Sequence, residues 1–308
     1  MNLSPCSIFT PVITLMLLLE VRAMAAAAAS SHPYCGPLPG SDVDKVQFAM
    51  NLEFLEAEYF LYGSMGKGLD KFAPYLTNGG PPPVGGQKAD LDELGFHIIQ
   101  EFAYEEIDHL RAINETVGGI PRPLLNISKE NFANIFDQAV GYKLDPPFDA
   151  YANTINYYLA SYLLPYVGLV GYVGAEPYLV NFTTKGLVAS LLGVESGQDA
   201  VIRALLYERG HLKVPPYDLT VAEFTDKLSQ LRNRLAMCGV KDEGVVVPTE
   251  LGAAGKTETN VLSAGKNSLS YRRNPQEILR IVYGTGDEHV PGGFYPHGGN
   301  GRIASSFL

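Results

Sequence analysis

The sequence predicts an all-α protein: a four-helix bundle, a fifth helix and a long irregular C-terminal extension. Capping signals precede several long segments whose apolar residues recur at helical spacing. Beyond Gly239 the chain is instead rich in Gly, Val, Ser and Thr. Two segments carry matching stripes at the spacing i, i+4, i+7, i+11, which places each stripe on one face of a helix. The stripes are Phe102, Glu106, His109 and Ile113, and Leu191, Glu195, Gln198 and Ile202.

The first two bundle helices are predicted from their ends. The first begins at Ser41, which has the form of an N-cap, and runs to about residue 62, where Gly63 interrupts it. The second spans about 89–117 and ends at Gly118. The connection that follows contains a short helix over about 131–140.

The third bundle helix is predicted over 150–175, a run without Asp, Glu, His, Lys or Arg. A membrane span is the alternative. Pro165, three Gly and two Asn favour a bundle helix that is buried on nearly all sides. Its six tyrosines either line a pocket or pack in the core, and core packing is favoured. They are Tyr151, Tyr157, Tyr158, Tyr162, Tyr166 and Tyr172.

The remaining helices also have clear signals. A fourth covers about 184–209, and a fifth begins at the capping box formed by Thr220 and Glu223. Asn274 caps a last short helix that ends near residue 283. The predicted bundle therefore spans 41–238, and residues 239–308 form an extension that packs on it.

The N-terminus predicts export. An apolar run over residues 8–19 precedes a small-residue stretch over 23–31, which indicates a signal peptide over 1–30. An N-terminal membrane anchor is the alternative. We expect no stable membrane insertion after cleavage. The protein is then secreted to the apoplast or cell wall, or reaches the vacuole through the secretory pathway.

Cysteines and sequons agree with export. Cys6 would leave with the signal peptide, so Cys35 and Cys238 either form one disulfide or stay two unrelated thiols. Three N-glycosylation sequons begin at Asn114, Asn126 and Asn181 and give weaker support.

Charge excludes some partners. The 308 residues carry a formal net charge of −10, which argues against a nucleic-acid partner. A homo-oligomer and a small-molecule ligand in the bundle core are both compatible with the sequence.

The two stripes carry the candidate chemistry. Two metal ions in a helical bundle are held by carboxylates and imidazoles from facing helices, with E-x-x-H motifs on two of them. Glu106 and His109 form one such motif. Glu195 and Gln198 form its damaged counterpart, with Gln in place of the second His.

The other bundle helices complete the set only in part. On the first helix, Glu53 is the preferred ligand and Glu56 the second choice, whereas Glu58 lies off that face. The third helix has no acidic residue. We therefore expect one Fe or Mn ion, or none. Without metal, the buried carboxylates would form a hydrogen-bonded polar network.

Residues 41–210 resemble the ferritin-like fold, and the whole mature chain is similar to the desiccation-related ferritin-like proteins of plants. The resemblance implies Glu53 or Glu56, Glu106, His109 and Glu195 as ligands. It places Pro165 where related bacterial proteins have a Glu on helix three. The segments that carry it are NLEFLEAE at 51–58, EEIDH at 105–109, YVGLVGYVG at 166–174, EILRIVYG at 277–284 and HVPGGF at 289–294.

Three functions are compatible with these observations. The first is a stress-associated protective protein with a vestigial or single-metal site. The second is an enzyme acting on a small organic molecule in the former metal cavity. Its chemistry is either O₂-dependent metal oxidation or metal-free acid–base catalysis by Glu106, His109 and Glu195. The third, iron storage, is the weakest, because nothing indicates a cage.

Overall fold

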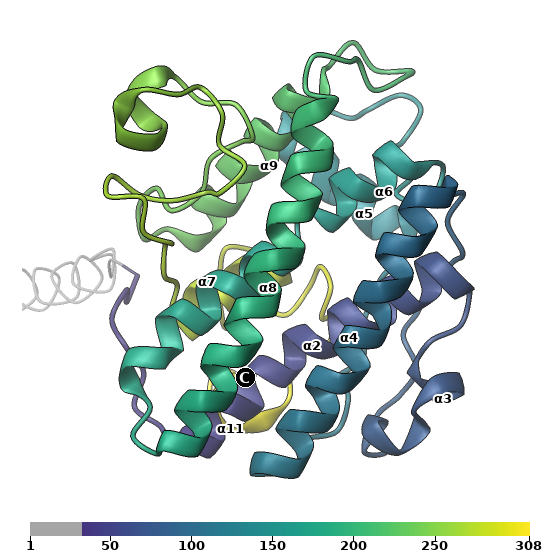
Figure 1. Cartoon of the computed structure of the whole chain (residues 1–308). Helices are drawn as coiled ribbons and strands as arrows, with labels where there is room; N and C mark the ends of the chain where they lie inside the picture. The colour runs from purple at the N-terminus through teal and green to yellow at the C-terminus, as the bar shows by residue number, and fades with distance from the viewer. Residues whose placement is uncertain (1–32) are drawn as a thin grey trace, which may run out of the picture. The chain divides into compact units, whose positions relative to one another are not determined.

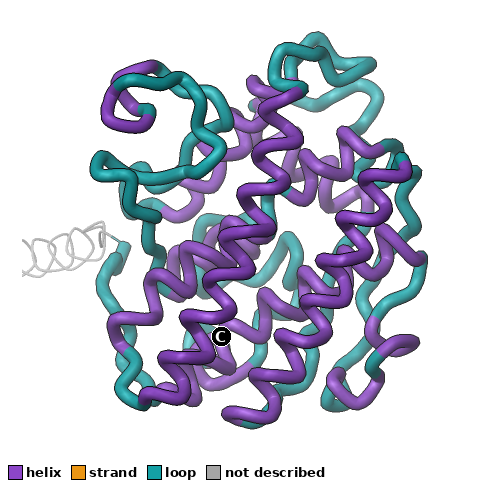
Figure 2. The backbone as a smooth tube through the Cα atoms, viewed as in Figure 1, coloured by secondary structure: helices purple, strands orange, loops and turns teal. Residues whose placement is uncertain are grey.

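The predicted all-α class is confirmed. A computed structural model describes residues 33–308, and within this range the chain is helical, with isolated β-bridges but no strand (Figures 1 and 2). The predicted signal peptide over 1–30 and Cys6 lie outside the described residues.

Four helices form the bundle that holds the candidate site. They are α2 (Asp42–Met65), α4 (Glu93–Val117), α7 (Pro165–Ala175) and α8 (Phe182–Glu208). Helix α2 packs along α4, and α7 packs along α8 (Figure 1). The buried face of α2 is mostly apolar but also carries acidic side chains, Asn51 and Ser64.

The third bundle helix differs from the prediction. The expected continuous helix over 150–175 is two helices, α6 (Thr154–Ser161) and α7, followed by a 3₁₀ turn, η2 (Glu176–Tyr178). Pro165 is the cause: it has no N–H for the preceding turn, so it starts a new helix at the first position. The stretch Thr154–Tyr178 has the length and composition of a membrane span, but 78% of that window is buried within the protein, as in a core helix.

The capping signals read from the sequence are confirmed. Ser41 caps α2. Thr220 with Glu223, and Asn274 with Glu277, each form both hydrogen bonds of a capping box. The remaining elements are α3 (Leu69–Phe72), η1 (Pro74–Thr77), α5 (Lys129–Val140), α9 (Val221–Ala236), η3 (Thr249–Leu251), η4 (Ala253–Gly255), α10 (Pro275–Tyr283) and α11 (Gly301–Ser305).

The C-terminal segment packs on the bundle through buried polar contacts. The Asn51 side chain, on α2, donates to the Asn300 carbonyl and accepts from its N–H at 2.9 and 2.7 Å. The Tyr295 hydroxyl donates to the Asn51 carbonyl at 2.7 Å. The guanidinium of Arg203, on α8, donates to the Asn260 carbonyl. The tail is largely irregular, as expected, but ends in α11.

Cys35 and Cys238 form a disulfide; the two cysteines are 203 positions apart in the sequence, and their Cα atoms are 5.7 Å apart. The bond ties the start of the described chain to the end of α9. Of the two alternatives for these cysteines, the paired one is confirmed.

Candidate metal centre

Four buried side chains from three helices converge inside the bundle. Glu53 comes from α2, Glu106 and His109 from α4, and Glu195 from α8. Each offers one ligand atom, and these atoms all lie within 4.8 Å of one another. The i, i+3 spacing on α4 is what puts Glu106 and His109 on the same side of that helix.

The imidazole of His109 is the centre of this cluster. Its Nδ1 lies 3.1 Å from Glu53 Oε2, 3.3 Å from Glu106 Oε2 and 3.9 Å from Glu195 Oε1. One ring nitrogen thus faces three carboxyl groups, an arrangement that a shared cation or a shared proton can stabilise.

Glu56 and Gln198, also candidates, lie beside these four residues. The Gln198 amide donates to Glu106 Oε1 at 2.7 Å and to Glu105 Oε2 at 3.1 Å. Gln198 therefore orients Glu106 through its nitrogen. Glu56 is 1% exposed, and neither of its oxygens has a hydrogen-bond partner among residues 33–308. Glu105 is half-buried against Gln198.

Helix α7 lies next to the centre but contains no acidic residue. Gly168, one turn after Pro165, lies so close that a Cβ at this position would be 2.8 Å from Glu195 Oε2. A larger residue there would displace the Glu195 carboxyl group. One turn further on, the Tyr172 hydroxyl donates to Glu53 Oε1.

Burial and mutual repulsion set the protonation of the metal-free centre. Burial raises the pKa of Glu106 to about 8 despite His109, and burial and neighbouring carboxylates raise the pKa of Glu56 and Glu195 well above the ordinary value. Burial also opposes ionisation of Glu53, but His109 outweighs it and lowers that pKa. Burial disfavours the His109 cation, yet Glu106 and Glu53 raise its pKa to about 12. At pH 7 these shifts keep His109 an imidazolium, Glu53 a carboxylate and Glu106 a neutral carboxyl group.

The donors fit a metal ion. Burying a polar oxygen without a partner costs roughly 1–3 kcal/mol, and a cation would satisfy several here at once. A set of carboxylates with one imidazole suits iron and manganese. At this centre, the buried oxygens without a hydrogen-bond partner among residues 33–308 are both of Glu56, both of Glu195, Oε2 of Glu106 and Oε1 of Gln198.

Comparison with known proteins decides the family. Residues 41–208 match the model of the ferritin-like domain. The chain belongs to the ferritin-like family. It is 62% identical over 287 residues to the ferritin-like catalase Nec2 of Nesocodon mauritianus, covering 90% of this chain and 92% of the relative. It is 51% identical over 277 residues to the desiccation-related protein PCC13-62 of Craterostigma plantagineum, and the alignment covers 90% of this chain and 88% of the relative. No solved structure matches.

Sequence reasoning missed two features of this ferritin-like site. Tyr172 was expected to pack in the core like the other five tyrosines, but its hydroxyl binds a candidate ligand. Gly168 makes room for the Glu195 carboxyl group. Gly168 and Tyr172 are four residues apart, so the helical spacing would have placed them on one face, but nothing in the sequence says which face meets the site.

Proposed function

We propose that this ferritin-like protein is a metal-dependent enzyme that disproportionates hydrogen peroxide to water and dioxygen. The observation that carries the proposal is the buried set of Glu53, Glu106, His109 and Glu195, whose ligand atoms lie within 4.8 Å of one another. A protein that is 62% identical to this chain is named a ferritin-like catalase. The identity extends over most of both chains, so it includes the helices that carry the set.

We further propose that these four residues hold one iron or manganese ion. When bound, such an ion would supply the redox chemistry that takes two electrons from one peroxide molecule and gives two electrons to another. The balanced reaction converts two H₂O₂ to two H₂O and one O₂. Two protons leave the peroxide that is oxidised, and two protons are consumed by the peroxide that is reduced.

The chain's own residues support this chemistry in two ways. Gln198 and Tyr172 hold Glu106 and Glu53 in place through hydrogen bonds. Glu56 is buried beside the set with two unpartnered oxygens and a raised pKa. Glu56 can give a proton to the peroxide that is reduced and regain one from the peroxide that is oxidised, which accounts for one of the two protons in each half-reaction; the other proton is exchanged with solvent.

Oxygen evolution tests the proposal. Protein reconstituted with Mn²⁺ or Fe²⁺ should release one O₂ for every two H₂O₂ consumed, followed with an oxygen electrode. His109→Ala should lower the rate at least 100-fold, because it removes the nitrogen ligand. His97→Ala is the matched control, since His97 is exposed on the same helix. Equal rates for the two variants, or consumption of peroxide without O₂, would refute the proposal.

A protective protein without turnover is the second candidate. The observation in its favour is the incomplete ligand set, with Gln198 at the second His position and no acid on α7. A 51% identical protein is named desiccation-related. This candidate predicts that Glu106→Ala, once folded, protects a dried test enzyme as well as the wild type does. Loss of protection would exclude it.

We also propose that the protein passes through the secretory pathway, as the N-terminal sequence predicts. The Cys35–Cys238 disulfide supports this, because such bonds persist in oxidising compartments. N-terminal sequencing of natively purified protein should begin near residue 31. A chain that begins at Met1 or Asn2 would contradict the proposal.

A further inference from the structure

A cavity of about 230 Å³ lies beside the metal centre, between α2, α7, α8, the start of α10 and residues 35–38. An apolar cavity of about 150 Å³ is enough to hold benzene. This one therefore has room for an aromatic ring and a short chain attached to it. Tyr178 and Arg272 are exposed among its lining residues, so solvent molecules can reach it.

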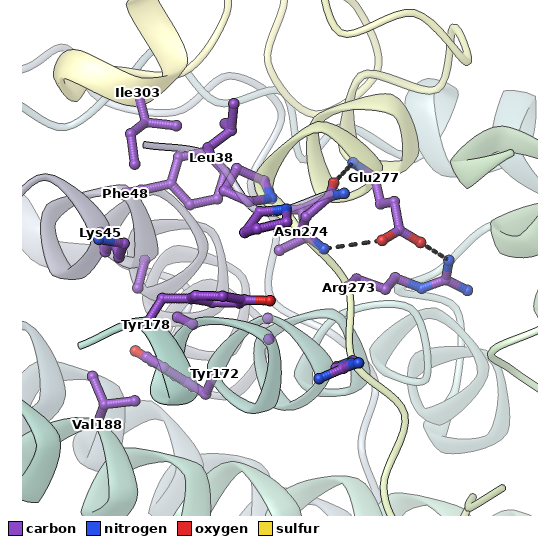
Figure 3. Close-up of a pocket in the computed structure, with 18 of the residues that line it drawn as sticks. Leu38, Lys45, Phe48, Tyr172, Tyr178, Val188, Arg273, Asn274, Glu277 and Ile303 are labelled. Atoms are coloured by element: carbon purple, nitrogen blue, oxygen red, sulfur yellow. Dashed lines mark hydrogen bonds and ion pairs between the residues drawn. The ribbon is translucent and has the colours of Figure 1, made fainter. Parts of the chain in front are cut away.

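The walls of the cavity are mainly apolar and partly aromatic. Figure 3 shows Phe48, Tyr172 and Tyr178 around the space, with Asn274 and Glu277 along one edge. Aromatic side chains contribute large contact areas and favour offset or edge-on packing of another ring. The shape and chemistry of these walls thus suit the ring of a small organic molecule.

The charge of the lining is opposite to that of the whole protein. Four cationic side chains, Lys45, Lys241, Arg272 and Arg273, line the cavity against one carboxylate, Glu277. This is a formal excess of three positive charges in a chain whose net charge is −10.

The four cations differ in their partners within the protein. Lys241 and Arg273 both bind Glu277, at 2.7 and 3.2 Å. Lys45 donates to the Gly40 carbonyl, and neither it nor Arg272 forms a salt bridge within residues 33–308. An ammonium has three donors and a guanidinium has five, so both groups keep donors for an anion.

Single residues separate the cavity from the candidate metal centre. Tyr172 lines the cavity, and its hydroxyl binds Glu53 on the other side. Gly168 also lines the cavity and lies against Glu195. The four candidate metal ligands are not among the lining residues, so an occupant of the cavity contacts different groups from the ion.

We propose that this cavity is a binding site for a small aromatic acid, a molecule with one ring joined by a short chain to a carboxylate. The ring lies between Phe48, Tyr172 and Tyr178, and the carboxylate binds Lys45 or Arg272, the two lining cations without a salt bridge among residues 33–308. The site is independent of the proposed peroxide chemistry, because it requires neither the ion nor turnover.

Isothermal titration calorimetry with three probes of similar size tests the proposal. The probes are 4-phenylbutyrate, 4-phenylbutanol and 4-phenylbutylamine, which differ in the charge of one end group. The wild-type mature protein should bind the carboxylate at least tenfold more tightly than the alcohol, and the amine more weakly than either. Raising the salt concentration should reduce the preference, because Arg272 is exposed.

Variants assign the effect to this cavity. Lys45→Gln combined with Arg272→Gln should reduce the affinity for the carboxylate probe to that for the alcohol probe. The affinity for the alcohol probe should not change. Ala175→Phe adds a ring to a lining position and should weaken both probes at least tenfold. The control is Lys67→Gln combined with Lys256→Gln, an equal change of charge at exposed positions outside the cavity. Thermal melting confirms that each variant is folded.

Three results would overturn the proposal. One is equal affinity of the wild-type protein for the carboxylate and the alcohol, and another is no measurable binding of any probe. The third is an undiminished carboxylate preference in the Lys45 and Arg272 double variant. None of these results would bear on oxygen evolution, so failure here is distinguishable from failure of the proposed function.

Discussion

The Gln198 amide nitrogen lies 2.7 Å from Glu106 Oε1, so the residue at the second histidine position acts as a hydrogen-bond donor to a candidate ligand. A histidine at this position would face the same region with a ring nitrogen. Both oxygens of Glu56 and both of Glu195 lack a hydrogen-bond partner among residues 33–308, so these carboxyl groups are available as ligands for a second ion.

Gln198→His should therefore raise the metal content. We expect about one Fe or Mn per chain in the reconstituted wild type, and between one and two in the variant, since an added imidazole is a strong ligand for these ions. Elemental analysis of protein after dialysis measures this. Gln198→Leu is the control for loss of the amide. The same metal content in the histidine variant and the wild type would show that residue 198 cannot reach an ion.

Tyr172→Phe should destabilise the metal-free protein by about 1–3 kcal/mol, because Glu53 loses a buried donor. Tyr158→Phe is the matched control. The Tyr158 hydroxyl is buried on α6 and has no hydrogen-bond partner among residues 33–308, so its removal should cost little. Urea denaturation of both variants gives the comparison. Equal losses would mean that the hydroxyl bond to Glu53 contributes no stability.

Metal binding should release protons and strengthen as pH rises. The pKa of Glu106 is raised to about 8 by burial, and that of His109 to about 12 by its carboxylate neighbours despite burial. Both groups are therefore protonated at pH 7, and an ion must displace these protons to bind. We expect at least one proton released per ion at pH 7 and weaker binding at pH 6 than at pH 8. A pH-indicator dye counts the protons, and affinity independent of pH would contradict this protonation state.

The tail should be held more firmly at neutral pH than in acid. Glu288 accepts from Arg280 at 2.6 and 2.7 Å, and although burial opposes ionisation, the pairing lowers the pKa of Glu288. A carboxyl group whose folded pKa is lowered adds stability above its unfolded pKa and loses it as pH falls through the folded value. Glu288→Gln should thus cost about 1 kcal/mol at pH 7.

The cost of Glu288→Gln should begin to fall near pH 4, where an unperturbed Glu becomes protonated, and should disappear only below the lowered folded pKa of Glu288. Glu115→Gln, at an exposed position on α4, is the control and should change stability little at either pH. Thermal unfolding at several pH values measures the difference. A cost that stays the same in acid would mean that the charge of Glu288 plays no part.

Local signals explain why much of this fold is readable from the sequence. Ser41, Thr220 and Asn274 each cap a helix as their spacing predicts, because capping depends on residues three positions apart. The i, i+3 placement of Glu106 and His109 likewise depends only on helix geometry. Where a local rule decides a feature, the prediction and the structure agree.

Features that depend on distant partners were not predictable. Glu58, expected off the site face, is buried against Arg122, which lies 64 residues later in a connection. The role of Tyr172 depends on how α7 is rotated against α2. The cavity combines residues from both ends of the chain. In each case tertiary packing decides which residues meet, so residue spacing along the sequence does not predict the contact.

Metal analysis of protein purified from its native source tests the central claim most directly. We predict about one Fe or Mn per chain, because a buried set of four donors should retain its ion through purification. Glu106→Gln and His109→Ala, purified in the same way, should lose it. Less than about 0.2 equivalents in the wild-type protein would contradict a native metal centre, since a site of ordinary affinity would be largely filled.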